Sequence, residues 1–163
     1  PPELYTPRLS SAASDVYKRQ EHRRALAMSM GATALVGVGA SLGEEFADVA
    51  GGPPDLIFEC VGAPGLLQQC MEIAPRRGML VPVGVCEQPD TILPFPALIK
   101  ELSIQFAIAY TREDYQTVIS MLAQGRVDAS PMVTGVVSLE QMPAAFEALR
   151  TPSDQCKILT SLR

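Results

Sequence analysis

Residues 55 to 85 decide the expected fold, and they read Asp-Leu-Ile-Phe-Glu-Cys-Val-Gly-Ala-Pro-Gly-Leu-Leu-Gln-Gln-Cys-Met-Glu-Ile-Ala-Pro-Arg-Arg-Gly-Met-Leu-Val-Pro-Val-Gly-Val. Of two short apolar runs, 56–61 is followed by Gly62, and 79–85 contains Gly84. Such runs are typical of strands that helices cover on both faces of a parallel sheet. The sequence between them places apolar residues at helical spacing and leaves Gln68, Gln69 and Arg76 for solvent.

This order of strand, helix and strand predicts a βαβ unit with two parallel strands. Ligands of such sheets bind beyond the carboxyl ends of the strands. Residues 59–62 and 83–85 are therefore the first places to look for function.

The rest of the chain continues the alternation of helices and strands. Glu21 begins an expected helix that Gly31 closes. Thr111 and Asp114 form a helix-start signal, as do Ser138 and Gln141. The other expected elements are a strand at 33–38, one or two helical turns at 44–49, a helix at 94–100, a strand at 102–109, a helix face made by Tyr115, Val118, Ile119 and Leu122, a strand at 133–137, a helix through 146–149 and a strand at 156–162.

Composition narrows the class of protein. The 163 residues favour one domain, with two small lobes as an alternative, and 47% of them are apolar. A net charge of -5 without a basic run argues against a nucleic-acid partner. No apolar run reaches the roughly 18 residues of a membrane span, and no secretory signal is visible. A cytoplasmic protein without a membrane partner is therefore expected.

The four cysteines, Cys60, Cys70, Cys86 and Cys156, show no CxxC or Cys/His spacing. Reduced thiols in the core are expected rather than disulfides or metal ligands, because Cys60 and Cys70 fall in predicted buried elements. Residues 1–20 differ in texture from the rest and resemble a vector-derived or disordered leader. They are set aside from the fold prediction.

From Glu21 onward the chain resembles the carboxyl-terminal part of medium-chain, zinc-dependent alcohol dehydrogenases. The resemblance rests on the ordered set Asp-Leu-Ile-Phe-Glu-Cys-Val-Gly, Gly-Met-Leu-Val-Pro-Val-Gly-Val, Ala-Ile-Ala, Arg-Val-Asp and Phe-Glu-Ala-Leu. It implies an α/β fold with a partial Rossmann-type parallel sheet and helices on both faces. Residues 21–130 would be the truncated NAD(P)-binding domain, and 131–163 a strand-helix-strand segment returning to a catalytic lobe.

The resemblance also assigns candidate cofactor-binding residues. Cys60, Val61 and Gly62 match the strand end along the adenosine side of NAD or NADP, and Arg23 matches a cation near the adenosine ribose. The matches beside the nicotinamide are Val83, Gly84, Val85, Ala107, Ile108 and Ala109. Gly62 is expected to let backbone approach closely.

Other family features have no match. The glycine-rich phosphate fingerprint would precede Glu21, and the acidic residue that binds the ribose would fall near Lys18. His22 is the only histidine and is expected to be solvated, so no catalytic residue or metal ligand is assigned. Zinc is expected in an intact parent only, and the fragment alone is expected to be inactive.

Four further charged residues have structural interpretations. Glu59 is either a perturbed acid or a structural carboxylate that accepts backbone hydrogen bonds. Asp114 and Glu140 are expected to be helix-start charges, and Lys157 a solvent-facing lysine.

The first hypothesis is therefore a fragment of a dehydrogenase that passes hydride between a small alcohol or carbonyl compound and NAD(P). The alternative is a non-catalytic α/β interaction or nucleotide-binding module, and a methyltransferase is a weaker rival. An exposed edge strand at 102–109 would pair two copies into a homodimer or tetramer.

Overall fold

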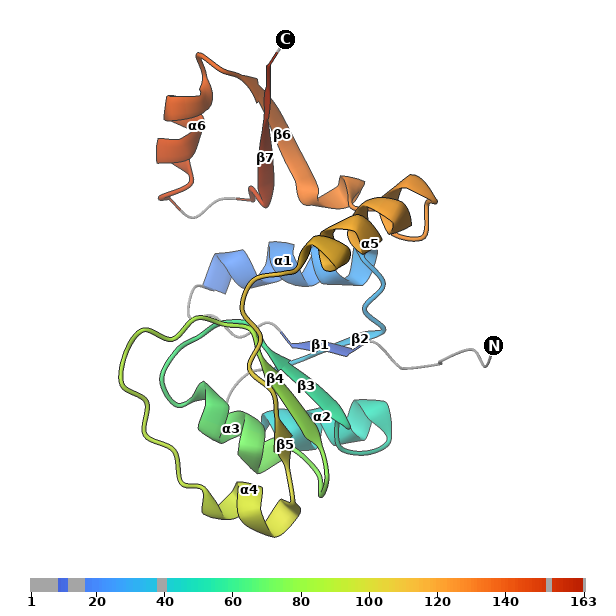
Figure 1. The fold of residues 1–163 in the computed structure, drawn as a ribbon, viewed down its shortest axis with the longest axis vertical. Helices are drawn as coiled ribbons and strands as arrows, with labels where there is room; N and C mark the ends of the chain where they lie inside the picture. Colours follow the sequence, from blue (N-terminus) through green and yellow to red (C-terminus); the bar gives the residue numbers. More distant parts are fainter. Residues whose placement is uncertain (1–8, 12–16, 38–40, 152–153, 163) are drawn as a thin grey trace.

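The computed structural model describes residues 9–11, 17–37, 41–151 and 154–162. The order of elements alternates helices with strands (Figure 1). They are β1 (Leu9–Ser11), α1 (Tyr17–Ser29), β2 (Ala34–Val36), α2 (Leu42–Ala50), β3 (Leu56–Glu59), α3 (Leu66–Ile73), β4 (Met79–Pro82), α4 (Phe95–Lys100), β5 (Ser103–Ile104), α5 (Arg112–Ala123), η1 (Ser130–Met132), β6 (Val133–Ser138), α6 (Met142–Ala148) and β7 (Lys157–Ser161).

The central sheet contains β3, β4 and β5 in that order, and all of its pairs are parallel. Leu56 pairs with Met79, and Leu80 pairs with Ile104. The helices α3 and α4 connect successive strands, as the right-handed crossover of a parallel sheet requires (Figure 1). The α/β fold class and the parallel pairing of the two apolar runs are confirmed.

The core lies on one face of this sheet. Met71, Ala74 and Leu80 are the buried residues of its cluster, and side chains from α4 and β5 pack against them. Since side chains alternate along a strand, Leu80 and its neighbours in register face α3 and α4. The apolar stripe of α3 therefore supplies one side of this core, and the sheet and α4 supply the rest.

The opposite side of the strands is less buried than expected. Leu56, Phe58 and Met79 share that side by register, and they are 46%, 59% and 45% exposed. The expectation of strands buried on both faces is wrong for these side chains, because α3 and α4 cover only the side that bears Leu80. The surface of the described residues is correspondingly apolar.

Two elements extend into or beside the segment set aside in the sequence. The strand β1 pairs in parallel with β2, and α1 begins at Tyr17 rather than at Glu21. The expected strand at 33–38 is the shorter β2, and α2 is longer than the expected turns at 44–49.

The expected strand at 102–109 is assigned as a strand only over β5, but its backbone continues along β4. Gln105 N–H donates to Leu80 O at 2.9 Å, and Ala107 N–H donates to Pro82 O at 3.0 Å. The extended course ends at Ala109, where φ is 63°. The segment therefore runs along β4 as predicted, up to Ala107. The prediction of a strand is wrong for its last residues, which leave the sheet.

The carboxyl-terminal part forms a separate parallel pair, β6 with β7, connected by α6. Figure 1 shows this unit beyond α1 and α5 from the central sheet. The apolar residues of α5 were expected to form a buried face, and that prediction is wrong. Tyr115, Val118 and Ile119 are each more than half exposed. Within the described ranges, none of the helices combines the length and hydropathy that crossing a bilayer demands.

Candidate functional site

Glu59 joins the carboxyl ends of β3 and β4. Its backbone oxygen accepts hydrogen bonds from Val83 N–H at 2.7 Å and Gly84 N–H at 2.9 Å. Its carboxylate Oε1 accepts from Val61 N–H at 2.6 Å and Gly62 N–H at 2.9 Å. Glu59 therefore holds both turns that the sequence singled out, and its interpretation as a structural carboxylate is confirmed.

Gly62 and Gly84 bring these two turns into backbone contact. Gly62 has φ of 73°, a conformation that favours glycine, and a Cβ atom on it would lie 2.5 Å from the Val85 backbone. A Cβ atom on Gly84 would lie 2.7 Å from the Val61 backbone. The close approach expected at Gly62 exists in this structure, and the approaching group is the neighbouring turn.

A cleft of about 480 Å³ opens beside this contact. It is lined by Gly62, Ala63, Pro64, Val85, Glu87 and Gln88. The apolar and small residues come from the two strand ends, and the polar ones come from the loop after β4. The structure thus gathers Cys60, Val61, Gly62, Val83, Gly84 and Val85 at one edge of the sheet, and it adds the 86–93 loop, between Val85 and Pro94, to the predicted set.

Two hydrogen bonds that the sequence did not predict hold the 86–93 loop in place. Gly65 N–H donates to Asp90 Oδ1 at 2.9 Å, and Leu93 N–H donates to Gln68 Oε1 at 2.8 Å. Gln68 was expected to face solvent, and that prediction was wrong because its amide oxygen pairs across to the loop. Each pair joins residues 25 positions apart. No local sequence signal marks such a pair.

The remaining predicted residues are linked less directly to the Gly62 and Gly84 turns. Ala107 reaches the end of β4 through its hydrogen bond to Pro82 O. Ile108 follows it and is 82% exposed, and Ala109 lies at the turn that ends the segment. Arg23 is exposed on α1 without a hydrogen bond or ion pair to another described residue. The neighbouring Arg24 instead donates from Nη1 to Val36 O at 2.8 Å.

The cysteines are free thiols, but most are not core residues. Cys60, Cys86 and Cys156 are exposed, and only Cys70 is half-buried. Burial raises the pKa of the Cys70 thiol to about 11, with a smaller contribution from the charge of Glu59. The pKa of Cys60 is raised by the same two causes. The prediction of core thiols is therefore correct only for Cys70, since the strand end that carries Cys60 is open.

Comparison with known proteins identifies the group of proteins to which this architecture belongs. The sequence model of a family described as zinc-binding dehydrogenase matches residues 16–124. The chain belongs to the zinc-binding dehydrogenase family. The match covers the central sheet and the cleft beside Gly62.

Relatives within the zinc-binding dehydrogenases are longer proteins. The chain is 32% identical over 116 residues to (R,R)-butanediol dehydrogenase of Bacillus subtilis, a match of 71% of this chain and 33% of that protein. The crystal structure of 2R,3R-butanediol dehydrogenase from Bacillus subtilis superposes with a TM-score of 0.79 at 28% identity, over 94% of this chain and 43% of that one. A putative zinc-binding dehydrogenase from Sinorhizobium meliloti 1021, bound to NADP, superposes with a TM-score of 0.76 at 25% identity, over 92% and 43%. The chain thus spans about a third of the curated relative.

The described side chains of this zinc-binding dehydrogenase chain offer no zinc site. No group of three or more His, Cys, Asp or Glu residues in the described ranges has an arrangement that fits a metal ion. His22, expected to be solvated, is half-buried on α1, and its Nε2 has no hydrogen-bond partner. The described residues therefore do not fit a zinc ion, and no step is derived through one.

The other charged candidates have structural roles. Asp114 Oδ2 accepts from Thr111 N–H at 2.8 Å in a capping box, which confirms the helix-start interpretation. Glu140 instead accepts from the Ser138 hydroxyl at 2.7 Å, and α6 begins later, at Met142. Lys157 is exposed on β7, as expected.

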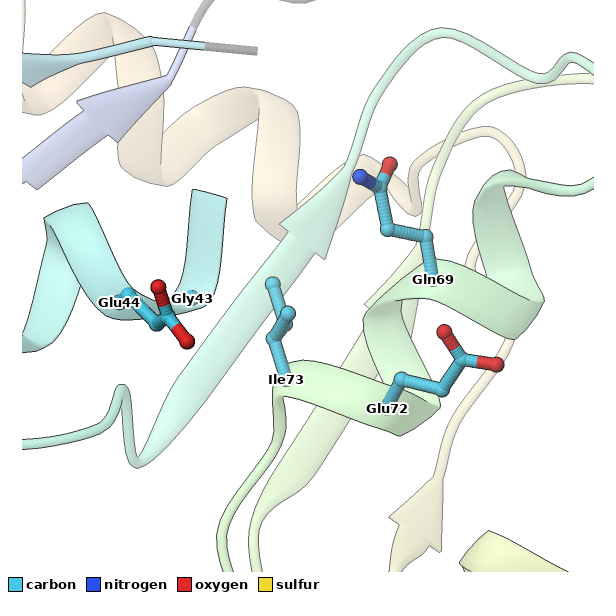
Figure 2. A pocket seen from close by; sticks show the side chains of 5 residues that line it. All are labelled: Gly43, Glu44, Gln69, Glu72 and Ile73. Atoms are coloured by element: carbon cyan, nitrogen blue, oxygen red, sulfur yellow. The ribbon is translucent and has the colours of Figure 1, made fainter. Parts of the chain in front are cut away.

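A second cleft, of about 390 Å³, lies between α2 and α3 (Figure 2). Its lining is Gly43, Glu44, Gln69, Glu72 and Ile73. Gly43 is packed against Ile73, since a Cβ on Gly43 would lie 2.9 Å from Ile73 Cγ2. Two carboxylates and no basic side chain line this cleft, so it is unsuited to a phosphate.

Proposed function

We propose that this chain forms the nicotinamide-side wall of the NAD(P) site in a dehydrogenase that acts on a small alcohol or carbonyl compound. One observation carries the proposal: Glu59 clamps the Gly62 and Gly84 turns together at the carboxyl ends of two parallel strands. That is where an open α/β sheet binds its ligand. The NADP-bound relative supports the choice of cofactor class.

The chain's residues suit the nicotinamide end of such a cofactor. Val83 presents an exposed apolar side chain at the end of β4, and Val85 lines the cleft. Apolar side chains flank a planar ring and exclude water from one of its faces. NAD(P), when bound, supplies the hydride acceptor or donor. The role of the protein here is to hold the ring in one orientation and keep its backbone partners rigid.

The substrate in this proposal is a small vicinal diol or the matching hydroxyketone. The Bacillus subtilis relative acts, by its name of (R,R)-butanediol dehydrogenase, on butanediol. The groups that would polarise the substrate oxygen, including zinc, are assigned to sequence outside this chain, because no described cluster fits the metal. Residues 131–163, which contain the β6–β7 pair, are assigned to the return segment of the catalytic lobe. The proposed location is the cytoplasm.

The proposal also includes pairing of two copies through the edge at β5. The N–H groups of Ser103, Gln105 and Ala107 bond to the β4 side. Because successive N–H groups of an extended segment alternate in direction, those of Ile104, Phe106 and Ile108 face the free edge. Phe106 and Ile108 are also strongly exposed, at 67% and 82%. Light scattering on a longer parent tests this point, and a monomeric mass contradicts it.

Activity measurements test the enzymatic proposal. The purified 163-residue chain is expected to form no NADH or NADPH from butane-2,3-diol. A longer parent that contains it is expected to do so, measured by absorbance at 340 nm. Turnover by the isolated chain would refute the assignment of the chemistry to other segments. A parent without turnover on diols, hydroxyketones and simple alcohols, with either cofactor, points instead to a non-catalytic α/β module.

A further inference from the structure

We propose that Asp90 and Gln68 are positioning residues that make the 86–93 loop a fixed wall of the cleft beside Gly62, an inference whose role in cofactor binding rests on the proposed function. The cleft has two sides. Gly62, Ala63 and Pro64 come from the turn before α3, and Glu87 and Gln88 come from the loop after Val85. What holds these sides at a set distance determines the shape of the cleft.

Two hydrogen bonds link the two sides directly. Asp90 follows Gln88 by two residues, and its Oδ1 accepts from the N–H of Gly65, which comes directly after Pro64. At the other end of the loop, Gln68 Oε1 accepts from Leu93 N–H at 2.8 Å. The loop is thus fastened at two points, and the bond between Gly65 and Asp90 is the one next to the lining residues in the sequence.

The orientation of Gln68 is itself set by its own helix. Its Nε2 donates to Glu72 Oε1 at 2.8 Å, one turn along α3. An amide has one acceptor oxygen and one donor nitrogen, so this bond turns the oxygen toward Leu93. The loop is therefore anchored to α3, the helix that packs Met71 into the core.

Asp90 also binds the N-cap residue of α3. The residue before α3 is Gly65, with φ of 84°, which has no side chain to cap the helix. The Asp90 carboxylate accepts the N–H of this N-cap residue from a distant part of the chain, and it brings a negative charge to the positive end of the helix. With Glu87 nearby, this side of the cleft suits a neutral or cationic group and disfavours a phosphate.

Amide hydrogen exchange of the 163-residue chain tests the positioning claim without any cofactor. Asp90→Ala is expected to speed exchange at Gly65 about tenfold, and Gln68→Ala to do the same at Leu93. Because the two bonds hold one loop, each substitution is also expected to raise exchange, by a smaller factor, at the amide of the other bond. Asp90→Asn keeps an acceptor oxygen and is expected to restore most of the protection. Asp48→Ala, at an exposed carboxylate of α2, is the matched control.

Two results would overturn the inference. One is unchanged exchange at Leu93 in Asp90→Ala together with unchanged exchange at Gly65 in Gln68→Ala. The other is an equal rise in the Asp48→Ala control. If Asp90→Ala lowers global stability so far that the chain unfolds, Gln68→Ala still decides the question, because Gln68 holds the loop at the opposite end.

Titration with NADH then separates this inference from the proposed function. If the wild-type chain binds NADH, Asp90→Ala and Gln68→Ala are expected to weaken binding about threefold to tenfold, and Asp48→Ala to leave it unchanged. Equal affinity in all four proteins contradicts a positioning role. Absence of binding by the wild type counts against the cofactor site in this chain, while the exchange result continues to decide whether the loop is held.

Discussion

Gly84 lies against Gly62 so closely that a Cβ atom on Gly84 would overlap the Gly62 backbone nitrogen. The contact joins the turns that end two parallel strands. Since backbone atoms on both sides form it, neither turn is able to move aside without losing the hydrogen bonds to Glu59.

Gly84→Ala is expected to destabilise the chain by about 2 kcal/mol, in the range of overpacking substitutions. Urea unfolding followed by circular dichroism measures the change. Gly52→Ala is the control, because the space around Gly52 is open and its φ is not positive. Equal effects of the two substitutions would show that the contact between the turns does not limit the fold.

Lys100 stabilises the end of α3 from outside that helix. Its Nζ donates to Glu72 O at 2.6 Å and Met71 O at 3.1 Å, two carbonyls of the last turn. Lys100→Met keeps the aliphatic stem and removes these bonds, so a loss of about 1 kcal/mol in the free energy of unfolding is expected. Lys157→Met, on exposed β7, is the comparison and is expected to change stability little.

Asp114 is expected to contribute to the dependence of stability on pH. The hydrogen bond from Thr111 N–H, and then the one from the Thr111 hydroxyl, lower the pKa of Asp114 below its ordinary value of 3.8. Because the folded state binds this proton less readily than the unfolded state, the contribution is present above about pH 4 and is lost as pH falls through the folded pKa.

Melting temperatures measured between about pH 2.5 and 6 check the direction of this pH dependence. The window extends about one to two pH units on either side of the ordinary pKa of 3.8. Wild-type protein is expected to lose stability on the acid side of this window, and Asp114→Asn to lose less over the same interval. Glu113→Gln, on the same first turn but without a side-chain hydrogen bond to described residues, serves as the control. A Glu113→Gln profile as flat as that of Asp114→Asn contradicts the assignment to the capping box.

The cysteines are expected to react in an order set by exposure and pKa. At pH 8, a thiol of pKa about 11 is almost entirely protonated, so Cys70 is expected to be labelled slowly by iodoacetamide. The exposed Cys86 and Cys156 are expected to be labelled first. Peptide mass spectrometry resolves the sites, and labelling in urea shows that Cys70 is reactive once unfolded. Equal native rates at Cys70 and Cys86 contradict the burial of Cys70.

Local patterns predicted the elements whose sequence signals lie within one short stretch of chain. The run from Asp55 to Val85 folds as strand, helix and parallel strand, as its apolar spacing indicated. The Thr111 and Asp114 signal forms a capping box because both partners lie in one turn. The predictions that failed concern burial: the apolar faces of α5 and of β3 are exposed, since burial depends on which other elements cover a face.

The sequence by itself determined the α/β class, the parallel βαβ unit and the two glycine turns at its carboxyl edge, because hydrophobic period and glycine conformation act over a few residues. Only the tertiary structure decided that Asp90 binds Gly65 at the start of α3 and that Gln68 holds Leu93, since each bond joins positions 25 residues apart. It also decided that Glu59 serves both turns at once. These relationships exist only when the parallel strands lie side by side, and a linear pattern does not encode that distance.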